Sequence, residues 1–191
     1  MRTRIIAALG LAAALFTTGC EDELDFGFGD WVARVDTVTL YTLEQPAYQG
    51  LPAAFDLVTG TARRVEDRNE TGRWDVVLTG GVGGEPLMLT PLGALLSLET
   101  QAAVAPIDGE TFDGLDIAPR DTLDYVFDSS VIVREDSVYV LRSRATGERS
   151  GGCIRFGKIE ALEVDPVIGS VTFRAIVNPN CNDRDLVPPE D

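Results

Sequence analysis

The stretch CIRFGKIEALEVDPVIGSVTFRAIVN, residues 153–178, decides the fold that the sequence predicts. Residues 153–164 and 170–178 are rich in β-branched and aromatic side chains, which favour strands. Between them, residues 165–169 (DPVIG) place a proline early and a glycine late, as turns commonly do. The stretch therefore predicts an antiparallel β-hairpin.

The register of this hairpin brings two cysteines together. Pairing Val164 with Ser170 makes opposite residue numbers add up to 334, and 153 and 181 have the same sum. Cys153 and Cys181 then face each other at the open end, within the Cα separation that a disulfide accepts. We expect them to form a disulfide, because exported domains with two cysteines usually do. A redox or metal site is the alternative, but the chain has no C-x-x-C motif.

The same register assigns one face of the hairpin to the core. Arg155 also falls on this face, so the pattern is not clean, and a bulge near Gly157 would shift the register by one residue. The apolar residues on the cysteine face are Ile159, Ala161, Val171, Phe173, Ala175 and Val177.

Further strand-like runs precede the hairpin, with turn signals between them. No strong helical period is present; the best helix candidate is 91–103, which reads equally well as a buried strand. Many short strands with regular turns predict an all-β, two-layer antiparallel β-sandwich-like single domain over residues 31–187, with a C-terminal tail at 188–191. The runs are 31–41, 55–58, 73–79, 86–90, 94–105, 125–127, 131–134 and 138–143.

The first twenty residues, MRTRIIAALGLAAALFTTGC, have the pattern of an export signal. Two arginines precede a 12-residue apolar segment, Ile5–Phe16, which is too short to span a bilayer as a helix. Small residues then lead to Cys20, as in the bacterial lipobox, although Thr17 stands where leucine is preferred. We expect a signal peptide at 1–19, a lipid on Cys20 and a flexible acidic tether at 20–30. Ordinary cleavage without a lipid is the alternative.

Charge and composition exclude several functions. The chain has 16 basic and 31 acidic residues; without Arg2 and Arg4, 14 basic residues remain and the net charge becomes −17. Such a surface disfavours nucleic acid. The chain has no histidine, which removes the usual general base and the commonest metal and haem ligand. We therefore expect no enzymatic activity and no catalytic residues.

We interpret the remaining motifs as structural features and not as functional sites. The glycine-rich run 80–84 lacks a dinucleotide or P-loop pattern, and Ser150 has no base beyond Lys158, the only lysine. Asp56, Asp75 and other acids could form the carboxylate pair of a glycosidase, but nothing in the sequence selects one pair over another. The best calcium candidate, without an EF-hand spacing, is the acidic stretch that holds Asp108, Glu110, Asp113, Asp116 and Asp121.

Four segments taken in order resemble the HmuY-like surface lipoproteins. The resemblance covers roughly residues 53–178, with 82–122 matched loosely, and rests on a "WD" strand before a glycine-containing loop and on the late hairpin. The segments are FDLVTG (55–60), RWDVVLTGG (73–81), DSVYVLRSRATGE (136–148) and CIRFGKIEALEVDPVIGSVTFRAIVN (153–178).

The resemblance implies an all-β, two-layer fold, an outer-surface lipoprotein and haem capture through paired histidines or methionines. This chain departs from that pattern, because it has no histidine and only Met88 follows the signal peptide. No ligand pair carries over, and Met88 is expected in the core. Tyrosine also ligates haem, and the candidates are Tyr41, Tyr48, Tyr125 and Tyr139.

Together these observations predict an exported, membrane-anchored lipoprotein with a non-enzymatic binding or scaffolding β domain. Its partners are the membrane, through Cys20, and an unknown protein or small molecule. The outer membrane or cell surface is favoured over the inner membrane. Two alternatives stay open: a haem or porphyrin binder with atypical ligation, and a calcium-stabilised adhesion module. No cofactor and no metal site is assigned to the domain.

Overall fold

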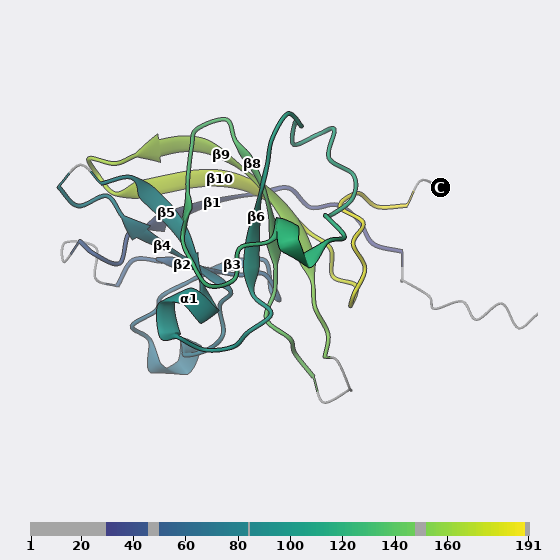
Figure 1. Ribbon diagram of the computed structural model, residues 1–191, viewed down its shortest axis with the longest axis horizontal. Coiled ribbons are helices and arrows are strands. Elements are labelled where there is room, and N and C mark those ends of the chain that lie inside the picture. The colour runs from purple at the N-terminus through teal and green to yellow at the C-terminus, as the bar shows by residue number, and fades with distance from the viewer. Residues whose placement is uncertain (1–29, 46–49, 84, 148–151, 190–191) are drawn as a thin grey trace, which may run out of the picture.

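Two antiparallel sheets face each other in the computed structural model, which describes residues 30–45, 50–83, 85–147 and 152–189 (Figure 1). Among the described residues, helix is confined to α1 (Leu92–Leu96) and two short 3-10 turns, Arg68–Glu70 and Thr122–Asp124. The strands are β1 (Asp36–Tyr41), β2 (Ala54–Asp56), β3 (Thr61–Arg63), β4 (Val76–Gly80), β5 (Leu87–Pro91), β6 (Ala103–Ile107), β7 (Val131–Ile132), β8 (Val138–Arg142), β9 (Phe156–Asp165) and β10 (Ser170–Val177).

The described strands form two five-stranded sheets, in the orders β1-β10-β9-β8-β6 and β3-β2-β4-β5-β7. We call them the first and second sheet. Every strand pair is antiparallel. The predicted all-β, sandwich-like fold is therefore confirmed.

The main core lies between the two sheets. Strand residues alternate between the two faces of a sheet, so every second residue points inward. Phe55 and Phe173, from opposite sheets, meet edge to face with ring centroids 5.4 Å apart. Around this pair the core contains Leu40, Leu57, Val76, Leu78, Leu87, Leu89, Val104, Val133, Tyr139, Leu141, Ile159, Ala161, Val171 and Ala175.

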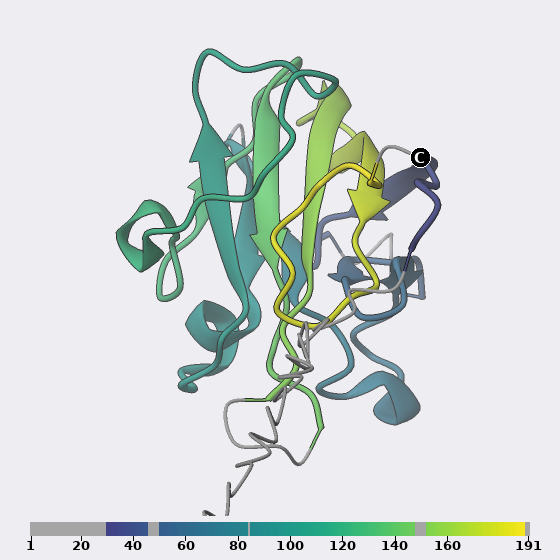
Figure 2. The ribbon, with the colours of Figure 1, turned by 90° about the vertical axis from the view of Figure 1, so that its right-hand side faces the viewer.

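The outer face of the first sheet is also buried. The long connection 108–127 and the C-terminal segment 179–189 lie across it, as the green and yellow chain segments in Figure 2 show. Leu186 of the C-terminal segment is fully buried there. This layer explains why β8 is apolar on both faces, with Val138 and Val140 pointing out toward the covering segments.

Lys158 lies inside this outer layer. It is in the middle of β9, only 1% exposed, and its Nζ donates a hydrogen bond of 2.8 Å to the carbonyl oxygen of Leu115. The ring of Phe112 contacts two cations, with its centroid 4.9 Å from Lys158 Nζ and 4.2 Å from Arg174 Cζ. Such contacts partly replace the water that a buried ammonium loses.

The hairpin of β9 and β10 forms as predicted, but its register changes once. From Phe173 to Val177 the paired numbers add to 334, as expected, whereas Ser170 pairs with Asp165 and Val171 with Val164, one residue off. Leu162 is the extra residue of a β-bulge, so the predicted pairing near the turn was wrong and the bulge is not at Gly157.

The bulge has a clear packing reason. Without an extra residue, strict alternation after Ala161 would turn Glu163 into the core and Val164 out to solvent. With Leu162 bulged out, Glu163 is exposed and Val164 packs against the main core.

The cysteine prediction is confirmed. Cys153 and Cys181 form a disulfide with their Cα atoms 4.9 Å apart, just beyond the paired part of the hairpin. Ile154 and Asn182 next to the bridge join the two arms, since the Asn182 backbone N–H donates to the Ile154 carbonyl oxygen at 2.7 Å.

Elsewhere some predicted runs are shorter or different. The run 31–41 is a strand only from Asp36, and 125–127 forms a single bridge at Val126. The run 94–105 divides between the end of α1 and the start of β6, and the helix candidate 91–103 is helical for five residues only. Strand β3 was not predicted. Met88, expected in the core, is half-buried on β5 and belongs to none of the core clusters.

Several predictions concern residues outside the described ones. They are the signal peptide 1–19, Cys20, the tether up to residue 29, Tyr48, Gly84, Ser150 and the last two residues of the tail. In the part of the chain that is described, no helix has the length and apolar character needed to cross a bilayer.

Reduction of the disulfide is expected to destabilise the domain by about 3–4 kcal/mol, because the bridge closes a loop with a sequence separation of 28 residues. Urea unfolding of oxidised protein and of a Cys153→Ser/Cys181→Ser double variant measures the difference. Coincident unfolding curves would contradict a stabilising bridge.

Burial lowers the pKa of Lys158, and the nearby Asp116 and Asp113 only partly oppose this. The unfolded chain then binds more protons than the folded one, so the Lys158 contribution to stability increases with pH up to the ordinary lysine pKa of about 10.4. Unfolding free energies of the parent and of Lys158→Met, measured at pH 7 and pH 9.5, are expected to show a larger increase in the parent. Equal increases would mean that Lys158 is not desolvated.

Candidate binding site

A buried ionic cluster ties the two sheets together at one end of the sandwich. Asp75 directly precedes β4, and its side chain is 0% exposed. Its Oδ2 accepts a 2.7 Å hydrogen bond from the Leu57 backbone N–H, and its Oδ1 accepts one of 2.7 Å from the Arg144 N–H. Arg144 follows β8 of the first sheet, so Asp75 links that sheet to the second.

The guanidinium of Arg144 is shared between two carboxylates. Its Nη1 lies 3.0 Å from Asp75 Oδ1 and 3.0 Å from Asp56 Oδ1. Burial raises the pKa of Asp75, while the charge of Arg144 and the hydrogen bonds from the Arg144 and Leu57 N–H groups oppose that rise. The charges are therefore compensated by a cation and by backbone donors, as buried charges require.

Asp56 and Asp75 are the two acids named from the sequence as members of a glycosidase pair. The structure does bring them together, but around one arginine and away from solvent, with their side chains 2% and 0% exposed. All four carboxylate oxygens accept hydrogen bonds from the protein itself. A substrate has no access to either acid in this arrangement.

Asp56 also fixes the turn that follows β2. Its Oδ1 accepts from the Val58 N–H at 3.1 Å, and its Oδ2 accepts from Thr59 Oγ1 at 2.8 Å and from Arg63 Nη2 at 3.0 Å. Gly60 completes the turn with φ +67°, a conformation that glycine adopts without strain.

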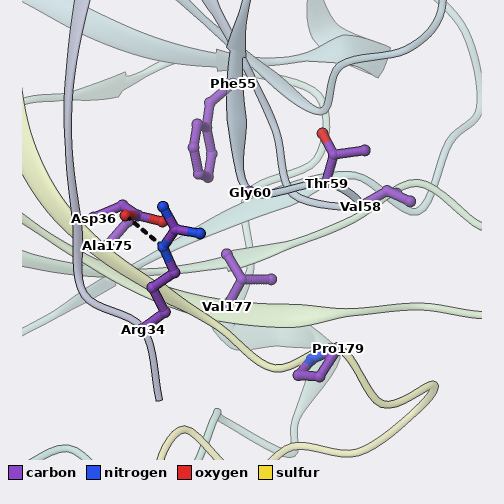
Figure 3. A pocket seen from close by; sticks show the side chains of 9 residues that line it. All are labelled: Arg34, Asp36, Phe55, Val58, Thr59, Gly60, Ala175, Val177 and Pro179. Carbon is purple, nitrogen blue, oxygen red and sulfur yellow. Dashed lines mark hydrogen bonds and ion pairs between the residues drawn. The ribbon is translucent and has the colours of Figure 1, made fainter. Parts of the chain in front are cut away.

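This turn is one wall of a cleft of about 200 Å³ (Figure 3). The opposite wall comes from the entry to β1 and the end of β10 in the first sheet. The floor is the edge of the main core, because Phe55, Ala175 and Val177 all belong to that core or pack against it. The lining residues are Arg34, Asp36, Phe55, Val58, Thr59, Gly60, Ala175, Val177 and Pro179.

The cleft exists because two paired strands end at different points. β1 begins at Asp36, opposite Ala175, whereas β10 continues for two more residues to Val177. Before Asp36 the chain leaves the sheet, and its exposed Arg34 forms an ion pair with Asp36 at 2.9 Å. Figure 3 shows the Arg34 guanidinium turned toward the space that the lining side chains surround.

Arg155 connects the two walls of the cleft. Its Nε donates to the Pro179 carbonyl oxygen at 2.9 Å, and its Nη1 donates to the Val58 carbonyl oxygen at 3.3 Å. Among the residues described, no carboxylate pairs with this guanidinium. Within the described part of the chain, Arg155 thus brings a guanidinium without a carboxylate partner to two of the residues that line the cleft.

The sequence did not predict this site, but it did indicate one residue that lies next to it. Arg155 was the charged residue that did not fit the predicted core face of the hairpin. It lies where that face reaches the end of the sandwich, so its side chain passes between the sheets and reaches carbonyl groups on both. Gly157, two residues on, has no side chain, and a Cβ there would approach Leu57 Cδ1 to 3.0 Å.

The calcium candidate is not assembled. No group of three or more acidic or cysteine side chains suited to a metal occurs among the described residues. Asp113 instead pairs with Arg174 at 3.5 Å, and Asp121 accepts the Leu123 N–H at the start of a 3-10 turn.

The haem-ligand candidates that the structure describes, Tyr41, Tyr125, Tyr139 and Met88, do not line the cleft. Tyr125 is buried and donates to the Pro119 carbonyl oxygen, and burial raises its pKa. The Tyr139 hydroxyl donates to the Ile132 carbonyl oxygen and accepts from the Arg134 N–H. Both hydroxyls are therefore engaged within the fold, and Tyr48 lies outside the described residues.

The described glycines of the run 80–83 form the connection from β4 toward β5. Gly80 and Gly81 adopt φ +81° and +77° where β4 turns toward β5. A Cβ on Gly80 would lie 2.2 Å from the Pro86 carbonyl oxygen, so no other residue fits there.

Comparisons with known proteins leave the chain without an assigned family. No family model matches it, no curated protein matches it, and no solved structure matches it.

Asp75→Asn is expected to lower the free energy of unfolding by about 2–4 kcal/mol, because an amide nitrogen would face an N–H donor and Arg144 would lose a charge partner. Urea unfolding measures the loss. Asp113→Asn is the matched control, since its side chain is 81% exposed, and we expect a change within about 0.5 kcal/mol. A similar loss in both variants would show that burial of Asp75 in the ionic cluster does not add to its contribution to stability.

Proposed function

We propose that this chain is an exported lipoprotein, anchored through a lipid on Cys20, whose β domain binds a ligand without chemical conversion. The observation that carries the proposal is the disulfide between Cys153 and Cys181 in a chain whose third cysteine, Cys20, follows an apolar leader. Disulfides persist mainly in oxidising compartments outside the cytoplasm. The third cysteine is then explained by the lipobox pattern at the end of the leader.

A binding role is supported by the groups that the cleft offers. Apolar side chains form its floor and the Arg34 guanidinium is turned toward it, which is a common composition for a binding site. The chain has no histidine, and the buried carboxylates Asp56 and Asp75 are occupied by Arg144. These features favour recognition over acid–base or nucleophilic catalysis.

The likeness to HmuY-like lipoproteins supports the same location and leaves their haem capture as a separate proposal for this chain. Pockets for drug-sized ligands measure about 300–1,000 Å³, and the cleft, at about 200 Å³, is smaller. The cleft therefore favours a small group over a porphyrin. The outer membrane or cell surface remains the location that we propose.

Replacement of Cys20 by serine is expected to remove the lipid and release the protein from the membrane. In cells of a bacterial host, the wild-type chain should partition into the detergent phase after Triton X-114 extraction and incorporate labelled fatty acid. The Cys20→Ser variant should do neither. Equal partition of both chains, without fatty-acid label on the wild type, would contradict lipid anchoring.

A further inference from the structure

We infer that the cleft between the Val58–Gly60 turn and the β1–β10 edge binds a small amphipathic carboxylate, with its apolar group on the core edge and its anion toward Arg34. This inference rests on the proposed binding function and names the ligand class. The export and lipid anchor are independent of it.

The size of the cleft limits the apolar group to a few carbon atoms. A dry cavity of about 150 Å³ in another protein holds benzene, and this cleft measures about 200 Å³. Its floor presents Phe55, Ala175 and Val177, which offer dispersion contacts and no hydrogen-bonding side chain. A branched aliphatic or single aromatic group matches this space.

Guanidinium donors at the cleft favour an anion despite the acidic surface of the whole chain. Among the residues that the structure describes, Arg34 bonds only through Nε, to Asp36 Oδ1, which leaves its terminal nitrogens for a ligand. Arg144 is shared by Asp56 and Asp75. Arg63 is shared by Asp56 and Glu70. Arg155 has no carboxylate partner among the described residues. Four arginines (Arg34, Arg63, Arg144 and Arg155) and four acids (Asp36, Asp56, Glu70 and Asp75) thus balance near the cleft, so an anion would be recognised by guanidinium donors and not by a net positive charge.

The anion and the apolar group must lie close together in the ligand. Arg34 and the floor residue Val177 line the same cleft, and the Thr59 hydroxyl lies at its rim. A carboxylate within a few bonds of a branched carbon group can reach both, as in an N-acylated apolar amino acid. Arginine and carboxylate form charge-assisted hydrogen bonds, which are stronger than neutral ones.

The test uses the chain from residue 20 onward with Cys20→Ser, titrated with N-acetyl-leucine and followed by backbone NMR. We expect saturable binding with a Kd of about 1 mM, a common range for so small a ligand, and signal changes at Thr59, Gly60 and Val177. N-acetylglycine lacks the apolar group and N-acetyl-leucinamide lacks the charge. Each should bind at least about tenfold more weakly.

Arg34→Gln supplies the variant test, because an exposed side chain can be changed without unfolding the domain. It should weaken N-acetyl-leucine binding several-fold and leave the weak binding of N-acetyl-leucinamide unchanged. Arg64→Gln is the matched control: it makes the same charge change at an exposed arginine that does not line the cleft, and should have no effect.

Three results would overturn the inference: no saturable binding at about ten times the expected Kd, equal affinity for the acid and the amide, or equal weakening by Arg34→Gln and Arg64→Gln. Any of them would leave the lipid anchor untouched, since detergent partition tests that separately. Loss of the anchor with retained N-acetyl-leucine binding would refute the location and keep the ligand class.

Discussion

The shared guanidinium of Arg144 is the contact on which the geometry of this sandwich depends. Apolar contacts between two sheets are non-directional, so they hold the layers together without fixing one sheet against the other. Arg144 enters from the first sheet and binds Asp56 and Asp75 of the second within 3.0 Å of each, which sets that position. A buried pair of this kind contributes little net stability, but loss of one partner is costly.

The cleft is a product of this constraint. Asp56 holds the turn after β2 through Val58 and Thr59, and Arg155 joins that turn to the end of β10. The cleft walls therefore belong to different sheets but are fixed by the same group of charges. Such preorganisation reduces the entropy that a ligand must otherwise overcome on binding.

The sequence predicted the fold class, the last hairpin and the disulfide, because these depend on local strand composition and on a simple register. It placed the bulge wrongly, since the choice between Glu163 and Val164 for the core is made by packing against the other sheet. It offered no reason to expect Asp56 and Asp75 close together, because Arg144, which binds both, lies 69 positions beyond Asp75. Local sequence patterns did not predict the outer layer over the first sheet either, because residues 108–127 lack a periodic pattern.

The burial of Lys158 determines how the domain surface responds to its surroundings. It is the only lysine and is 1% exposed, and the chain has no histidine. Apart from the amino terminus, the positive charges at the surface are guanidinium groups, which stay protonated throughout the physiological pH range. The folded surface thus offers no lysine amine to acylating or glycating reagents.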